Sequence, residues 1–165
     1  MTTKYYVDQS GIYLGGFSEA NPDIPPSSVE VPSPPPCSGY SWNGASWIDT
    51  KPHLISSLAE IRYNKEVGGI SLSGLPIRTD DRSKGLISGK YAKIINEDPA
   101  LTFLVKLSNS FITITNAQMV SIFLAVNAHV QKCFDCEAAT LIKINDDTLT
   151  TAQAVEDYFN AQYIA

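Results

Sequence analysis

The placement of proline constrains this chain more than any other sequence feature. Seven of the ten prolines in the 165 residues lie between Pro22 and Pro36. Proline has no backbone N–H and a fixed φ, so this stretch cannot form a regular helix and is unsuited to a central strand. The sequence therefore predicts an extended arm over residues 22–36, partly in the polyproline II conformation.

Short β-prone runs flank the arm on both sides. They pair as hairpins would: residues 4–7 with 12–17 around a polar turn, and residues 40–42 with 46–48 around Asn43-Gly44. Asn-Gly is a strong signal for a tight hairpin turn. We therefore expect residues 1–49 to form a small antiparallel β module, which carries five acidic side chains against one lysine.

The remaining residues alternate between helical and hairpin patterns. Apolar spacing and capping residues predict helices over about 53–67, 81–96 and 117–140 and a last one near the C-terminus, with hairpins over 69–79 and 101–115. The first of these hairpins is expected to turn at Gly74-Leu75-Pro76. Hairpins mixed with helices, without βαβ alternation, predict an α+β fold for residues 53–165.

The longest predicted helix has an apolar stripe in steps of four and three. Its members are Met119, Phe123, Val126, Val130 and Cys133. This spacing is typical of one face of a long amphipathic helix. The segment Thr115–Gln118, at the start of this helix, has the spacing of a capping box.

Charge and hydropathy exclude several classes of protein. The net charge of −5 argues against a nucleic-acid-binding module, which needs clustered Lys and Arg. The longest apolar run, Met119–Val126, is far shorter than the roughly 20 residues that cross a bilayer. The N-terminal residues lack the apolar segment of a secretory signal, and three cysteines suit reduced thiols, so we expect the chain to begin in the cytoplasm.

The most tempting candidate for chemistry is the set His129, Cys133 and Cys136. On a straight helix His129 and Cys136 would lie about 10 Å apart along the axis, too far to share one zinc ion. Core packing is the preferred interpretation of the cysteines, and we predict no catalytic residue, no metal and no cofactor. A small metal-dependent enzyme built around Cys133 and Cys136 is the least favoured alternative.

Aromatic side chains are concentrated in the N-terminal module. The candidate partner-binding residues are Tyr5, Tyr6, Tyr13, Phe17, Tyr40, Trp42 and Trp47. So small a β module has little core of its own, and Tyr and Trp are favoured at interfaces. Two interpretations stay open and are compatible: these rings bind a partner, or they form a small core wrapped by the proline arm.

Three segments of the C-terminal region carry motifs that resemble a known family. They are R-x-x-x-E-x-x-G-[IV] at residues 62–70, I-x-T-D-x-x-S at residues 77–83 and A-x-x-x-H-V-Q-x-C-F at residues 125–134. Together they resemble, over about residues 53–160, a domain of unknown function common in phages and prophages and encoded beside tail-fibre genes. The resemblance brings no catalytic residues. Thr79, Asp80 and Ser83 are interpreted as a hairpin end and helix cap, and His129–Phe134 as helix core.

The N-terminal module resembles the opening of small tail-fibre assembly proteins. It has a Tyr-rich hairpin, I-P-x-x-x-V-E-V-P at residues 24–32 and W-x-G-x-x-W at residues 42–47. The resemblance implies a non-enzymatic tail-fibre accessory protein that binds the fibre or baseplate in the host bacterial cytoplasm, with a homotrimer as a further hypothesis. The main alternative is a permanent structural subunit of the virion tail with receptor or sugar contact. No nucleic-acid or membrane partner is expected.

Overall fold

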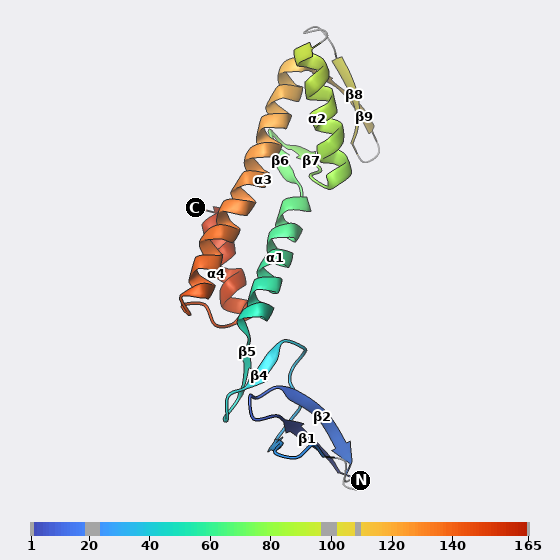
Figure 1. Cartoon of the computed structure of the whole chain (residues 1–165). Helices are drawn as coiled ribbons and strands as arrows, with labels where there is room; N and C mark the ends of the chain where they lie inside the picture. The colour runs from blue at the N-terminus through green and yellow to red at the C-terminus, as the bar shows by residue number, and fades with distance from the viewer. Residues whose placement is uncertain (1, 19–23, 97–101, 108–109, 165) are drawn as a thin grey trace. The chain divides into compact units, whose positions relative to one another are not determined.

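The computed structural model describes residues 2–18, 24–96, 102–107 and 110–164. Within them the chain forms nine strands and four helices, labelled in Figure 1. In chain order they are β1 (Thr3–Val7), β2 (Tyr13–Ser18), β3 (Val29–Val31), β4 (Tyr40–Trp42), β5 (Trp47–Asp49), α1 (Lys51–Val67), β6 (Ile70–Leu72), β7 (Leu75–Ile77), α2 (Asp81–Asn96), β8 (Thr102–Leu107), β9 (Ser110–Thr115), α3 (Asn116–Asn145) and α4 (Ala152–Ile164). Antiparallel hairpins together with helices confirm the predicted α+β class.

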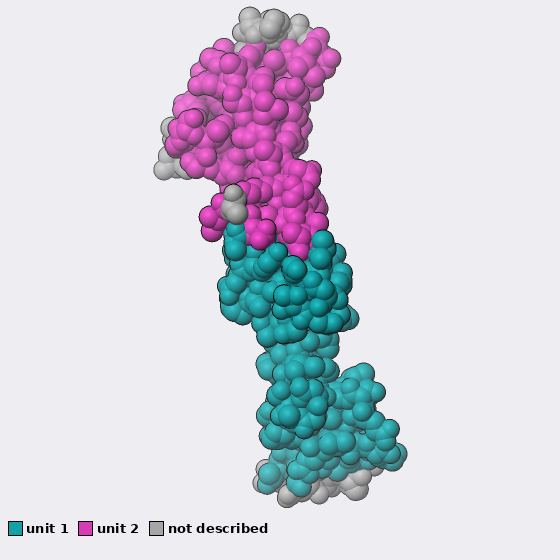
Figure 2. All heavy atoms as spheres, turned by 90° about the vertical axis from the view of Figure 1, so that its left-hand side faces the viewer, with its two compact units in different colours: residues 1–58, 140–161 teal, residues 59–139, 162–165 magenta. Residues whose placement is uncertain are grey.

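The chain divides into two compact units, coloured separately in Figure 2. Unit 1 comprises residues 1–58 and 140–161, and unit 2 comprises residues 59–139 and 162–165. The two domains predicted from the sequence, 1–49 and 53–165, have other boundaries than these two units. That division stays a prediction about which part folds by itself.

The β module of unit 1 contains a three-stranded antiparallel sheet in the order β2-β1-β3. Tyr6, Val7 and Val31 are its buried apolar side chains. The pairing of β3 with β1 was not predicted, although β3 lies in the described part of the arm, residues 24–36. It fits the proline pattern because β3 is a short edge strand. The second hairpin, β4–β5, joins this sheet through the Trp42 N–H, which donates to the Gly11 carbonyl at 2.9 Å.

Helices complete the core of unit 1. Leu58, Ile144, Val155 and Phe159, from α1, α3 and α4, are fully buried. Asp49, at the end of β5, binds two of these helices. Its Oδ1 lies 2.8 Å from His53 Nδ1 on α1, and its Oδ2 accepts the first N–H of α4 at 3.0 Å.

Unit 2 is built on the N-terminal part of α3. Its buried cluster is Ile114, Met119, Ile122 and Val126, against which residues of α2 and of the hairpins β6–β7 and β8–β9 pack. α2 itself has no buried residue among those described. None of the described helices is long and apolar enough to cross a membrane.

The apolar stripe of α3 lies on the predicted long helix and is buried at three of its five positions. Met119, Val126 and Cys133 are buried, whereas Phe123 and Val130 are half-buried. Their neighbours Ile122 and His129 take the buried positions. The burial of His129 agrees with the interpretation of residues 129–134 as helix core, and hydrogen bonds from other segments satisfy its ring. The helix also ends five residues beyond the predicted residue 140.

The turn predicted at Gly74-Leu75-Pro76 is wrong by about one residue. The turn residues between β6 and β7 are Ser73 and Gly74, with φ of 51° and 80°, and Leu75 and Pro76 belong to β7. A two-residue hairpin turn of this kind needs positive φ at both positions, which proline cannot adopt. Residues 108–109 of the turn expected between β8 and β9 lie outside the described residues.

Candidate functional site

The seven aromatic residues predicted to bind a partner do not form one cluster. Tyr13, Trp42 and Trp47 meet edge to face, with ring centroids 5.5–6.0 Å apart. Tyr6 and Phe17 form a second pair at 5.8 Å. Successive side chains of a strand point to opposite faces, which separates Tyr5 from its neighbour on β1.

One further ring of the module packs toward the helices. Tyr40 lies 5.6 Å from the His53 ring of α1. Burial raises the pKa of the Tyr40 hydroxyl, and the nearby Asp49 carboxylate acts in the same direction. This residue therefore joins the module to α1 within unit 1.

The module combines a small core with an accessible surface. Tyr6 is buried, while the other six predicted residues are half-buried and keep part of each ring in contact with solvent. The Trp47 indole N–H donates to the carbonyl of Ser33 in the proline arm at 3.1 Å. The rings are thus held in place by the module and remain partly available, so both interpretations stay open.

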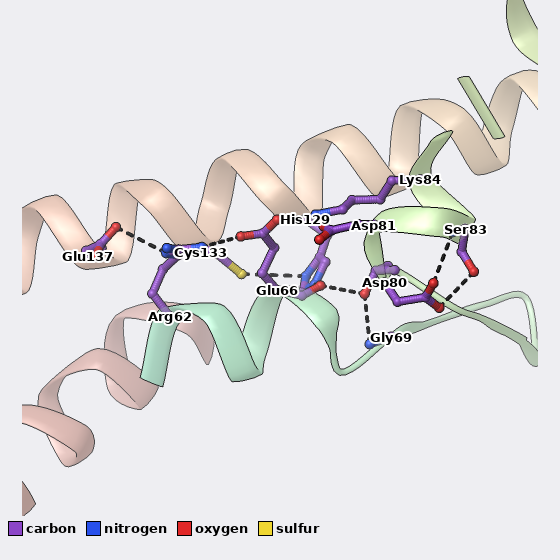
Figure 3. A network of polar contacts seen from close by, with 11 residues as sticks. Arg62, Glu66, Gly69, Asp80, Asp81, Ser83, Lys84, His129, Cys133 and Glu137 are labelled. Carbon is purple, nitrogen blue, oxygen red and sulfur yellow. Dashed lines mark hydrogen bonds and ion pairs between the residues drawn. The ribbon is translucent and has the colours of Figure 1, made fainter. Parts of the chain in front are cut away.

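A second site lies in unit 2, where the three motif segments of the sequence meet (Figure 3). The carbonyl oxygen of Glu66, at the end of α1, accepts hydrogen bonds from Thr79 Oγ1 and from His129 Nε2 on α3, the latter at 3.0 Å. The Thr79 hydroxyl also accepts the N–H of Gly69 at 2.9 Å. One carbonyl and one hydroxyl therefore tie together segments that are far apart in sequence.

Local sequence explains why these segments approach so closely. Gly69 has φ of +86°, and a Cβ added there would lie 3.0 Å from the Ile77 carbonyl oxygen. Glycine is suited to both the left-handed conformation and the close approach. Asp80 then caps α2: its carboxylate accepts the Ser83 N–H at 3.1 Å and the Ser83 hydroxyl at 2.8 Å, which lowers the pKa of Asp80. The predicted helix cap is confirmed.

Charged side chains surround the same point. The Glu66 carboxylate, in a residue only 6% exposed, binds Arg62 of α1 and Lys84 of α2. Each cation has a second partner: Arg62 Nε lies 3.3 Å from Glu137 Oε2, and Lys84 Nζ lies 3.0 Å from Asp81 Oδ1. The charges alternate, which compensates for their removal from water.

The ion pairs shift the pKa values of Glu66 and Lys84. Burial alone would raise the pKa of the Glu66 carboxyl, but the hydrogen bonds from Lys84 and Arg62 outweigh burial and lower this pKa. The hydrogen bond to Glu66 raises the pKa of Lys84. Both groups are therefore charged at neutral pH.

His129 is held from both sides of its ring. Because Nε2 faces a carbonyl oxygen, it must donate, and Nδ1 lies 2.7 Å from the Tyr163 hydroxyl of α4. Lys65 and Lys132 place their ammonium groups 4.3 Å and 5.4 Å from the centroid of the Tyr163 ring. Burial raises the pKa of the Tyr163 hydroxyl.

The adjacent thiols are poorly suited to nucleophilic chemistry. Cys133 Sγ lies 3.9 Å from His129 Nδ1, but burial raises the pKa of Cys133 to about 11, so it is a thiol at neutral pH. Burial also raises the pKa of Cys136. Among the described residues, no three His, Cys, Asp or Glu side chains gather as a metal-ligand set.

One motif residue was placed wrongly by the sequence. Phe134, interpreted as helix core, is 45% exposed. The Arg62 guanidinium lies 4.8 Å from its ring centroid, so the ring covers the cation rather than entering the core. Lys84, Glu137 and Tyr163 were not predicted as parts of a site. The only available signal was the spacing of Arg62 to Glu66 and Asp81 to Lys84 along their helices.

Fold and site together define an α+β protein in which a hydrogen-bonded polar cluster joins α1, α2, α3 and the ends of the β6–β7 hairpin. Residues 49–160 match the model of a family described as Domain of unknown function (DUF4376), and the chain belongs to this family. The match includes the whole polar cluster except Tyr163 and begins at the last residue of β5. No curated protein and no solved structure matches the chain.

Proposed function

We propose that this chain is a non-enzymatic accessory protein of a phage or prophage tail fibre, which binds the fibre or baseplate through residues 1–49 and supports fibre assembly or attachment. The motif resemblance supports the phage context. The proposed site of action is the host bacterial cytoplasm during assembly, with a homotrimer as the form that matches a trimeric fibre.

The observation that carries a binding role is the edge strand β2. Its six residues contain no proline and no charged side chain, and β1 pairs with only one of its edges. Natural proteins usually protect such an edge, because it offers unpaired N–H and C=O groups to a strand of another chain. Leu14 in β2 and Ile12 just before it are exposed, and Leu14 is the extra residue where the register with β1 shifts between Tyr6 and Val7. An added fibre strand would cover both.

The polar cluster of unit 2 supports a non-enzymatic role. Its carboxylate is neutralised by cations on either side, its imidazole is hydrogen-bonded at both nitrogens, and its thiols are protonated. A group used in this way stabilises the fold and is not free to transfer protons or attack a substrate. Assays for hydrolase activity with and without added Zn²⁺ should give no turnover, and turnover that is lost on replacing Cys133 and Cys136 would establish the enzyme alternative.

The first experiment is mass spectrometry of purified particles together with pull-down of the chain from infected-cell lysate. If the chain captures fibre or baseplate from lysate but is absent from particles, the accessory role is supported. A fixed copy number in particles supports instead a permanent tail subunit, with residues 1–49 as its attachment. If the chain captures neither fibre nor baseplate and is also absent from particles, the proposal is contradicted.

Variants of the edge strand test where the partner binds. Replacing Ile12 and Leu14 with Lys should abolish capture of the fibre while leaving the circular dichroism spectrum unchanged. The matched control is Ile142→Lys, which places the same charge at an exposed aliphatic position on α3. Equal binding by all variants would exclude β2 as the interface.

A further inference from the structure

Unit 2 contains an apolar groove that neither the polar cluster nor the proposed module interface uses. It has a volume of about 650 Å³ and lies between α2, β7, the hairpin β8–β9 and the N-terminal part of α3. Cavities of several hundred Å³ are typical of ligand and peptide sites. Ile114, Met119 and Ile122 of the buried cluster contribute to its lining.

The walls of the groove are apolar and open to solvent. Leu86 on α2 is 57% exposed and Leu104 on β8 is 66% exposed, and both line the groove. Ile87 and Val105, the neighbours of these two residues, also line it and are half-buried. Exposed apolar side chains continuous with a core mark a surface that another molecule covers.

The rim of the groove is basic in a chain whose net charge is −5. Arg78, Arg82 and Lys90 line it, and the one acid among its described lining residues is Asp80, whose carboxylate is already bound to Ser83 and Arg78. Among the described residues no carboxylate pairs with Arg82 or Lys90. Lys90 Nζ lies 5.6 Å from the centroid of the Phe103 ring, so both cations beside the apolar groove lack a carboxylate partner within this part of the chain, although Lys90 contacts a ring.

This combination favours one class of occupant. Apolar walls require apolar side chains, and guanidinium groups bind carboxylates with directional hydrogen bonds. Among the lining residues that the structure describes there is no aromatic ring on which a base could stack, which disfavours single-stranded nucleic acid. An apolar peptide segment with acidic residues at its flanks would satisfy both the walls and the rim.

We propose that this groove binds an acidic, apolar peptide segment of a partner protein, with Arg82 and Lys90 pairing its carboxylates and Leu86 and Leu104 contacting its apolar side chains. The site lies in unit 2 and does not depend on residues 1–49. The groove is therefore a second binding surface, separate from the one proposed on β2.

The test is selection of a displayed library of random short peptides against the full-length chain. Enriched peptides should combine apolar residues with Asp or Glu. Against the double variant Arg82→Glu/Lys90→Glu, selection should shift to apolar peptides with Lys or Arg, and a synthetic peptide selected on the natural chain should bind this variant about tenfold more weakly or worse.

Two further variants separate the groove from other surfaces. Leu104→Glu places a charge in the groove at an exposed position and should abolish binding of the selected peptide. Ile142→Glu, equally exposed on α3 outside the groove, should leave it unchanged. No enrichment, or binding that Leu104→Glu leaves intact, would overturn the proposal. Concentration-dependent dimers that Leu104→Glu dissociates would also overturn it, by showing that a second copy covers the groove.

Discussion

The buried carboxylate of Glu66 offers the sharpest quantitative test of the polar cluster. Glu66→Gln keeps the size of the side chain and removes the charge that Arg62 and Lys84 bind. Breaking a buried ion pair commonly costs about 3–5 kcal/mol, because the remaining charge is left uncompensated. Here each cation keeps a second carboxylate, Glu137 or Asp81, at 3.3 Å or less. We therefore expect a loss of about 2–3 kcal/mol in the free energy of unfolding.

A double-mutant cycle isolates the contact with Lys84. Combining Glu66→Gln with Lys84→Met should give a coupling energy of about 1–2 kcal/mol, since the two groups are in direct contact. Unfolding in urea should be followed by far-ultraviolet circular dichroism. Both tryptophans, Trp42 and Trp47, lie in unit 1, so their fluorescence would not report on this site. Glu60→Gln, an exposed carboxylate on the same helix, is the control and should change stability by less than about 0.5 kcal/mol.

The same variant makes a prediction about pH with a definite sign. The pKa of Glu66 is lowered from its ordinary value of 4.5 in the folded chain. Its carboxylate therefore stabilises the fold above the unfolded pKa, and this contribution disappears as the pH falls through the lower folded pKa. The stability difference between the natural chain and Glu66→Gln should be full at pH 7 and should shrink as the pH falls below 4.5 and through the lowered folded pKa. A difference independent of pH, or a coupling below about 0.5 kcal/mol, would refute the ion-pair account.

Three further predictions concern other parts of the structure. Thr79→Val should lower the free energy of unfolding in urea by about 2 kcal/mol, because it leaves a backbone N–H without its acceptor. Thr79→Ser keeps the hydroxyl and should lower it by about 1 kcal/mol. Equal losses would contradict a role for the hydroxyl. Asp49→Ala should destabilise unit 1 by about 1–2 kcal/mol and speed hydrogen exchange at the start of α4, where its carboxylate accepts an N–H; unchanged exchange there would contradict this cap. Iodoacetamide at mildly alkaline pH should label exposed Cys37 rapidly and buried Cys133 and Cys136 slowly, as mass spectrometry would show; rapid labelling of all three would contradict their burial.

Local signals predicted those elements whose cause lies within a few residues. Asn43-Gly44 gave the β4–β5 hairpin, with the Asn43 side chain accepting the N–H groups of the next residues. The capping box at Thr115 is confirmed: the Gln118 side chain accepts the Thr115 N–H at 2.9 Å. In each case the side chain satisfies a backbone group of its own segment, so the sequence pattern is sufficient.

Long-range features could not be predicted from the sequence, because their causes do not lie within one segment. The β3–β1 pairing joins Val31 to Tyr5, and nothing local in either strand selects the other. The polar cluster needs α1, the start of α2 and α3 together, although each motif in isolation indicates only a helix end, a cap or a core. Phe134 was misplaced because apolar character alone does not distinguish a buried ring from one that covers a cation.

The polar side chains of the motif residues stabilise the fold. A binding function is therefore to be sought at other residues. Arg62, Glu66, Thr79 and His129 use their polar groups to bind one another across three segments. Their pattern therefore identifies a way of joining two helices and a hairpin, and it specifies no reaction. The proposed binding is therefore to be sought on surfaces outside the cluster, and the edge of β2 and the basic groove of unit 2 are the two proposed surfaces. Substitutions at either surface should abolish one interaction and leave stability unchanged, whereas substitutions in the cluster should weaken binding in the groove only through loss of the folded unit.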